Sequence, residues 1–262
     1  MHQVLFKVFG FEVRSYGVLL VLGIVFAVLW SRRRASRWGI EPEKVFDATF
    51  WGVIPGILGA RIGFILQEWD YYSKNPDKLW TFRFEGLTSF GGVIMALAGL
   101  LWFARRTKIS AWAFLDVCAP PLLMAHVLGR VGCLLNGCCY GRQTTAWYGV
   151  RVSDYITTLF EPAQVFEGFM VMVGVGVILL VERKQRNNGT SISLAVIVWG
   201  LARFIYEFFR AGTIGEVARG AATSTYWGSL PVTQAHVAAF AMVLIGCAML
   251  WIVSRKPKPE EK

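Results

Sequence analysis

Long apolar runs separated by short polar stretches dominate this chain. Seven of these runs are long enough to cross the roughly 30 Å hydrocarbon core of a bilayer as helices. We expect them at residues 16–30, 45–66, 87–103, 111–134, 164–181, 192–209 and 232–253. Because only helices satisfy their own backbone hydrogen bonds in lipid over such lengths, the pattern predicts an all-α, polytopic membrane protein of about seven spans.

The composition agrees with this class, since 55% of the 262 residues are hydrophobic. We expect a single integral-membrane domain over residues 1–262. Residues 1–15 mix phenylalanines with polar residues and predict an interfacial lead-in, while residues 254–262 predict a solvated cytoplasmic tail. The first apolar run has its arginines after it rather than before it, so we expect no cleaved signal peptide.

The net charge of +10 would suggest a nucleic-acid partner if its distribution were ignored. The basic residues instead gather in alternate connections, beginning with Arg32, Arg33, Arg34 and Arg37 after the first apolar run. The positive-inside rule therefore predicts an outer N-terminus and a cytoplasmic C-terminus, with no nucleic-acid partner.

Several ionisable residues lie inside the apolar runs, where each charge is costly. Arg130 must enter or border the membrane; an arginine at the centre of a span costs roughly 3 kcal/mol, so this charge needs a partner. His126 lies one turn earlier on the same helix face, and Glu167 needs a partner of its own. Arg203 and Glu207, at i and i+4, also fit a pair that only neutralises itself. The predicted topology brings all of these residues to the outer half of the bundle.

Other polar and small residues have structural interpretations beside functional ones. Arg61, near a helix end, is best explained by a side chain that reaches the interface. Gly91 and Gly92 fit close helix packing, which is common in membranes. Four potential zinc ligands lie close together in the sequence: His126, Cys133, Cys138 and Cys139. They lack paired C-x₂-C spacing, so we predict no metal; a disulfide and free thiols that close a turn both remain open. Asn136 and Gly137 predict a helix end.

Six short motifs occur in order along the chain: Tyr16-Gly17, Gly59-Ala60-Arg61, Gly91-Gly92, Gly129-Arg130-x-Gly132 continuing through Asn136 to Gly141, Pro162-x-Gln164-x-x-Glu167, and the run from Arg203 to Arg210. Each motif alone is weak. In this order and in a seven-span setting, they resemble the prolipoprotein diacylglyceryl transferase family over nearly the whole chain.

The chain departs from the pattern of that family at four places. Phe90 stands where many members have a histidine proposed as the catalytic base, and Glu161 replaces another histidine. Cys133 and Cys138 stand where many members have asparagine and glutamate. Our hypothesis is that His126 replaces the histidine missing at Phe90.

The resemblance implies a reaction in the bacterial cytoplasmic (inner) membrane. The diacylglyceryl group of phosphatidylglycerol moves to the thiol of the lipobox cysteine in the signal peptide of a prolipoprotein. A thioether forms and glycerol phosphate leaves, with no cofactor and no metal. The alternatives are a protein that binds or transports lipid headgroups, a thiol-redox protein that uses Cys138 and Cys139, and a diverged paralogue of the transferase.

The resemblance also implies roles for individual residues. Arg130 and Arg203 would bind the phosphate, and Glu207 would orient Arg203. His126 or the arginines themselves would activate the substrate thiol. The residues expected to contact substrate are Tyr16, Gly91, Gly92, Arg130, Asn136, Gly141, Gln164, Glu167 and Arg210.

Overall fold

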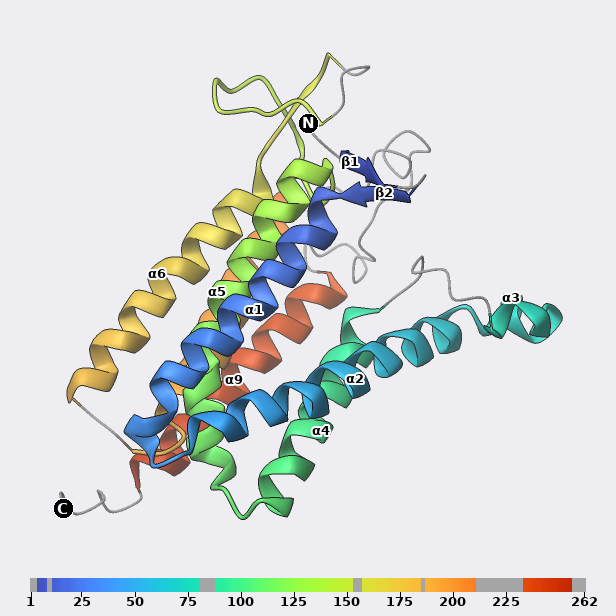
Figure 1. The fold of residues 1–262 in the computed structure, drawn as a ribbon. Helices are drawn as coiled ribbons and strands as arrows, with labels where there is room; N and C mark the ends of the chain where they lie inside the picture. The colour runs from blue at the N-terminus through green and yellow to red at the C-terminus, as the bar shows by residue number, and fades with distance from the viewer. Residues whose placement is uncertain are drawn as a thin grey trace. The chain divides into compact units, whose positions relative to one another are not determined.

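The protein folds almost entirely as helices in the computed structural model, which describes residues 4–8, 11–80, 88–152, 157–184, 187–210 and 233–255 (Figure 1). The long helices are α1 (Ser15–Ala35), α2 (Pro42–Gln67), α4 (Ser89–Arg106), α5 (Ala111–Asn136), α6 (Ala163–Lys184), α7 (Thr190–Phe209) and α9 (Gln234–Ser254). The shorter elements are α3 (Trp69–Lys74), the 3₁₀ turns Ser36–Trp38 and Pro76–Trp80, and the strands β1 (Val4–Val8), β2 (Phe11–Arg14), β3 (Gln143–Thr144) and β4 (Leu159–Phe160).

Each predicted apolar run lies on a long helix, so the all-helical class is confirmed. Among the described residues, six helices are long and apolar enough to cross a membrane: α1, α2, α5, α6, α7 and α9. The remaining predicted span lies on α4, which is not in this group, so the count of seven stays a prediction. The lead-in at residues 1–15 contains a two-stranded antiparallel hairpin, in which Lys7 and Glu12 form an ion pair of 2.8 Å. Residues 256–262 of the predicted tail lie outside the described residues.

The chain divides into two compact units. The first unit comprises Met1–Trp30 and Leu115–Lys262, and the second comprises Ser31–Phe114. Each unit is held together by helices that approach closely at small residues, as membrane helices commonly do.

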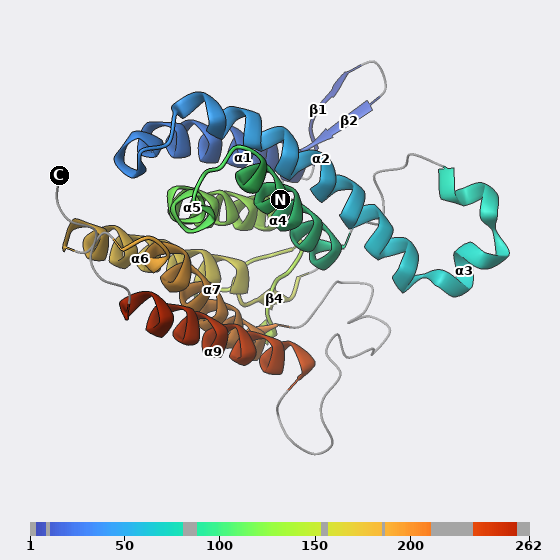
Figure 2. The same cartoon turned by 90° about the horizontal axis from the view of Figure 1, so that it is seen from below.

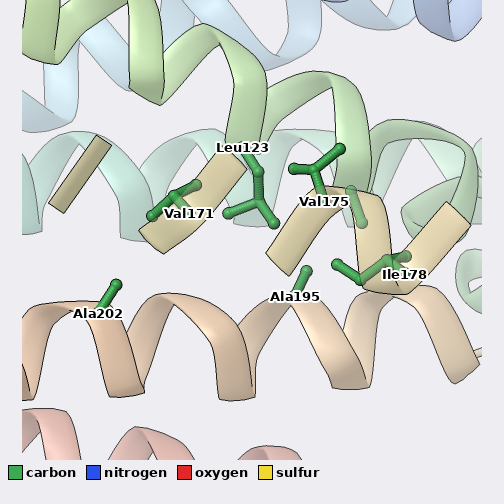
Figure 3. Close-up of a cluster of buried hydrophobic side chains, with 7 residues drawn as sticks. Leu123, Val171, Val175, Ile178, Ala195 and Ala202 are labelled. Atoms are coloured by element: carbon green, nitrogen blue, oxygen red, sulfur yellow. The ribbon is translucent and has the colours of Figure 1, made fainter. Parts of the chain in front are cut away.

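In the first unit, α7 lies between α6 and α9 (Figure 2). A buried apolar cluster joins α5, α6 and α7; its members are Ala119, Leu123, Val171, Val175, Ile178, Ala195 and Ala202. Figure 3 shows Leu123 of α5 and Ala195 of α7 directed toward the valine and isoleucine side chains of α6. At the opposite end of α5 from Asn136, buried Asp116 accepts hydrogen bonds from the backbone N–H groups of Gly189 and Ile192. This carboxylate satisfies donors at the start of α7 and ties that end to α5.

In the second unit, α2 packs against α4 through glycines on both helices. A Cβ at Gly92 would lie 3.3 Å from the carbonyl oxygen of Gly56 and 3.3 Å from the Ala60 Cβ. A Cβ at Gly91 would collide with the backbone of Gly59. The packing alternative for the Gly91-Gly92 pair is therefore confirmed.

We predict that Gly200→Ala destabilises the first unit. A Cβ there would lie 2.9 Å from Val243 Cγ2 and 3.0 Å from the Ala239 carbonyl oxygen, so α7 and α9 must separate. Overpacking of this kind costs about 1–3 kcal/mol, which should lower the midpoint of thermal unfolding in detergent.

The matched control is Gly176→Ala on the exposed face of α6, where a Cβ would meet nothing within 4 Å. It should leave the midpoint unchanged or raise it slightly, because alanine favours helix over glycine. Equal shifts in the two variants would contradict the proposed role of the close α7–α9 approach.

Candidate functional site

Two arginines from different helices of the first unit lie against one tyrosine ring. The Cζ atoms of Arg130 on α5 and Arg203 on α7 lie 4.9 Å and 4.8 Å from the centre of the Tyr206 ring. Tyr206 is 1% exposed, and its hydroxyl donates a hydrogen bond of 3.1 Å to the Cys139 carbonyl oxygen. Cation–π contacts of this kind strengthen when water is excluded. The tyrosine ring therefore contacts both guanidinium groups, one from each helix.

The partner that Arg130 needs is Glu167 on α6. The Arg130 Nη2 atom lies 2.6 Å from Glu167 Oε2, and the glutamate side chain is fully buried. His126 Nε2 lies 3.4 Å from Glu167 Oε1 and accepts a hydrogen bond of 3.4 Å from Arg130 Nε. A Cβ at Gly168 would lie 3.7 Å from the Arg130 Cβ, an ordinary van der Waals contact, so α6 runs directly beside the arginine stem. The structure thus gathers a cation, an anion and an imidazole from two helices.

A second carboxylate, that of Glu207, forms ion pairs with two arginines at the end of α7. Arg203 Nη2 lies 3.2 Å from Glu207 Oε2, and Arg210 Nη1 lies 3.5 Å from Glu207 Oε1. The expected i,i+4 pair of Arg203 and Glu207 is confirmed. Since Glu207 also pairs with Arg210, its single negative charge cannot balance both guanidinium groups.

Two residues that sequence reasoning missed support Glu207 from the start of α9. The Thr233 hydroxyl donates to Glu207 Oε1 at 3.3 Å and lies 3.0 Å from Nδ1 of His236. His236 is 2% exposed, and its ring contacts those of Phe204 and Phe208. The available signal was a capping box that opens the last apolar run with a threonine and, three residues later, a histidine.

The turn after α5 is the next part of the site. α5 ends at Asn136, as predicted, and Gly137 and Cys139 both take left-handed backbone conformations, with φ of 68° and 63°. The fully buried Gln164 donates a hydrogen bond of 3.3 Å from its Nε2 to the Cys138 carbonyl oxygen. Among the described residues, its Oε1 has no hydrogen-bond partner.

Three thiols meet at this turn. The sulfur atoms of Cys133, Cys138 and Cys139 all lie within 4.8 Å of one another, and all three cysteines are free. Hydrogen bonds from the other two thiols lower the pKa of Cys139, and the positive charges of Arg130 and Arg210 lower it further. Of the two alternatives left open by the sequence, the structure contains free thiols rather than a disulfide.

Gly141 joins the turn to the end of α7. Its backbone N–H donates a 2.7 Å hydrogen bond to the Glu161 carbonyl oxygen, and it forms a β-bridge with Arg210. A Cβ at Gly141 would lie 2.6 Å from the Phe209 carbonyl oxygen, so glycine is required for this approach. The bridge brings Arg210 beside the turn.

The other predicted contact residues fall at two places. Tyr16 at the start of α1 packs against α5, where a Cβ at Gly132 would lie 3.3 Å from its ring. Gly91, Gly92 and Arg61 belong to the second unit, where the Arg61 Cζ lies 5.6 Å from the centre of the Tyr72 ring. The Phe90 side chain lies outside the described part of the chain.

The cluster of arginines and glutamates in the first unit is suited to binding an anion where little water is present. Guanidinium groups bind phosphate oxygens in planar, bidentate geometry, and in the first unit three of them face two carboxylates. Because the groups are held by buried partners, they need little rearrangement when negative charge develops on a ligand.

Comparison with known proteins gives consistent matches. The family model described as prolipoprotein diacylglyceryl transferase matches residues 3–252. A Clostridium perfringens protein named phosphatidylglycerol–prolipoprotein diacylglyceryl transferase 2 is 32% identical, with 83% of this chain and 86% of the relative covered. Proteins named phosphatidylglycerol–prolipoprotein diacylglyceryl transferase from Chloroflexus aggregans and Enterococcus faecalis are each 31% identical. They cover 96% and 82% of this chain, and 89% and 81% of their own lengths.

We predict that Glu167→Gln destabilises the protein strongly. The change leaves the Arg130 guanidinium buried without its counter-charge, and breaking a buried pair in this way costs about 3–5 kcal/mol. A lower midpoint of thermal unfolding in detergent would show it. Glu161→Gln removes the same charge from a side chain with no ion pair to the described residues, and it should have a much smaller effect. A Glu167→Gln variant as stable as Glu161→Gln would contradict the prediction.

Proposed function

Because this chain belongs to the prolipoprotein diacylglyceryl transferase family, we propose that its tyrosine-bound arginines hold the phosphate of phosphatidylglycerol during transfer to prolipoproteins. The protein is a membrane transferase of the first step of lipoprotein maturation. Diacylglyceryl transfer from phosphatidylglycerol is the function that its site supports best.

The reaction exchanges one bond to carbon for another. The substrate sulfur attacks the glyceryl carbon that carries the phosphate, and a C–S bond forms as the C–O bond breaks. The electron pair of the C–O bond goes to the phosphate oxygen, and the thiol proton ends on the released glycerol phosphate. Negative charge therefore grows on the phosphate as the bond breaks, so cations placed beside it accelerate the step.

The observation that carries this proposal is the approach of Arg130 and Arg203 to the ring of one buried residue, Tyr206. The two guanidinium groups offer planar donors to the same phosphate. Arg210 adds positive charge next to Arg203, because Glu207 balances only one of that pair.

The carboxylates act as positioning groups in this proposal. Glu167 fixes Arg130, and Glu207, itself held by Thr233, fixes Arg203. The hydrogen-bonding groups proposed for the headgroup are the Tyr16 hydroxyl, the Asn136 amide and Gln164 Oε1, while Gly141 shapes the turn. Gly91 and Gly92 remain proposed substrate contacts within the second unit.

His126 is the proposed acceptor of the thiol proton. Its Nε2 accepts a hydrogen bond from Arg130, so the neutral ring carries its proton on Nδ1 and Nε2 is the atom that can take up a proton. Once protonated there, the imidazolium would face Glu167 Oε1 at 3.4 Å, and the carboxylate would stabilise it.

The finer assignments complete the proposal. The nucleophile is the lipobox cysteine of a signal peptide, and the membrane is the bacterial cytoplasmic membrane. The chain crosses it seven times as one domain, with α4 as the third span, the N-terminus outside and the C-terminus in the cytoplasm. The excess of basic residues in the connections predicted to be cytoplasmic supports this orientation.

We predict that Arg130→Lys and Arg203→Lys each lower transferase activity by about 10²–10³, because lysine keeps the charge but loses the bidentate donors. Activity is measured with phosphatidylglycerol vesicles and a peptide that carries a lipobox. Arg183→Lys at the far end of α6 is the matched control and should keep full activity.

Wild type and the same variants are also tested for their ability to restore growth to a bacterium depleted of its own transferase. Wild type and Arg183→Lys should restore growth, and the two site variants should not. A well-expressed wild type that fails in both assays would refute the proposed function and favour a lipid-binding protein or a diverged paralogue.

We predict that His126→Gln lowers kcat with a smaller change in KM, because glutamine can hydrogen-bond to Glu167 but cannot accept the thiol proton. The control measurement is the pH profile, which should lose the limb that belongs to the wild-type base. A variant with full activity in purified membranes would exclude His126 as the proton acceptor.

A further inference from the structure

Three cysteine side chains converge where α5 ends, although only two of them are adjacent in sequence. Cys133 lies on the last turn of α5, and the backbone N–H of Cys138 donates to its carbonyl oxygen at 3.1 Å. The left-handed residues Gly137 and Cys139 fold the chain back on the helix end. As a result, all three sulfur atoms lie within 4.8 Å of one another.

This separation is close to what one tetrahedral metal ion requires. With Zn–S bonds of about 2.3 Å, two thiolate ligands lie roughly 3.8 Å apart. Side-chain rotations that move each sulfur by about 1 Å or less would place all three on one ion. The absence of paired C-x₂-C spacing argued against a metal, but that spacing describes a different turn from the one formed here.

Two buried side chains outside the turn hold it in place. The Gln164 amide donates to the carbonyl oxygen of Cys138, and the Tyr206 hydroxyl donates to that of Cys139. Each donor thus fixes the backbone of one potential ligand. Outer partners of this kind set the directions of ligand side chains in metal sites.

Positive charge beside the turn would suit a metal site with thiolate ligands. The guanidinium groups of Arg130 and Arg210 lie within electrostatic reach of Cys139. They would offset the net negative charge of a divalent ion bound by three thiolates, and the thiolate is the form that binds metal. Soft sulfur ligands in a tetrahedral arrangement select zinc over harder divalent cations.

We propose that Cys133, Cys138 and Cys139 bind one Zn²⁺ ion, and that the fourth ligand of this ion is the thiol of the prolipoprotein substrate. Three protein ligands and one exchangeable ligand are the usual composition of a catalytic zinc site. The metal site stands on the geometry of the turn, whereas the identity of the fourth ligand rests on the proposed function.

The site would supply the thiolate that the transfer consumes. Bound zinc would favour the thiolate form of the substrate cysteine, and His126 would receive the proton that this thiol releases. The substrate sulfur would attack the glyceryl carbon, a C–S bond would form as the C–O bond breaks, and the proton would end on glycerol phosphate. Zinc changes no oxidation state, so no oxidant or reductant is needed.

The position of the turn agrees with this role. Tyr206 contacts the Cys139 carbonyl oxygen with its hydroxyl, and Arg130 and Arg203 with its ring. One tyrosine therefore spans from the proposed sulfur site to the proposed phosphate site, the two places that the nucleophile and the leaving group must occupy.

The test of the metal site is the zinc content of the full-length chain, purified in detergent with a phosphine reductant, before and after removal and return of zinc. Wild type should bind about one zinc ion per chain. Cys138→Ser and Cys139→Ser should weaken zinc binding by about tenfold or more. The control is Cys247→Ser, which replaces an exposed thiol on α9 and should bind zinc as wild type does.

Four outcomes would overturn the proposal. Wild type could take up no zinc, bind copper in its place or form a disulfide among these cysteines, or the Cys138→Ser and Cys139→Ser variants could bind zinc normally.

The test of the fourth ligand uses Co²⁺ in place of zinc, because thiolate-to-cobalt absorption reports the ligands directly. A peptide with one lipobox cysteine should change this absorption, and the same peptide with serine should not. Co²⁺ absorption that is unchanged by the cysteine peptide would refute the substrate-thiol ligand. Zinc content needs no turnover, so an inactive wild type that still binds zinc through these thiols would refute the transferase function and leave the metal site standing.

Discussion

The constraint on which the first unit depends is the cost of ionised side chains in a helical bundle built for lipid. Arg130 and Glu167 come from different helices, and each makes the burial of the other tolerable. Their contact fixes how α5 and α6 face each other at one end. His126 lies beside this pair, because both of its ionic neighbours belong to it. Packing of apolar side chains elsewhere in the unit is permissive by comparison, since lipid offers those side chains an equally apolar environment.

Much of the fold could be predicted because lipid leaves few choices of secondary structure. Apolar runs of sufficient length must be helices, and each predicted run is one. The need of Arg130 for a partner also followed from its position. The sequence could not say which carboxylate this would be, because Glu167 and Glu207 were both candidates and the contacts join helices distant in the chain.

The residues that were missed share a physical reason. Tyr206 lies in an apolar helix, where a tyrosine is indistinguishable from core until the arginines on its ring are known. His236 and Thr233 have local capping roles that hide their support of Glu207. The meeting of the three thiols depends on left-handed backbone at Cys139, a conformation that a residue other than glycine rarely shows and that a sequence pattern does not reveal.

Glu167 and Glu207 differ in how well the protein would tolerate the loss of an arginine partner during evolution. Glu167 has Arg130 as its one arginine among the described residues, so neither member can drift without stranding the other. Glu207 has two arginines, and Arg210 still neutralises it when Arg203 is replaced. A duplicated gene could therefore lose Arg203 early, keep a folded membrane protein and shed its chemistry. Paralogues that no longer catalyse this reaction should therefore lack Arg203 on α7 while they still keep Arg130 on α5.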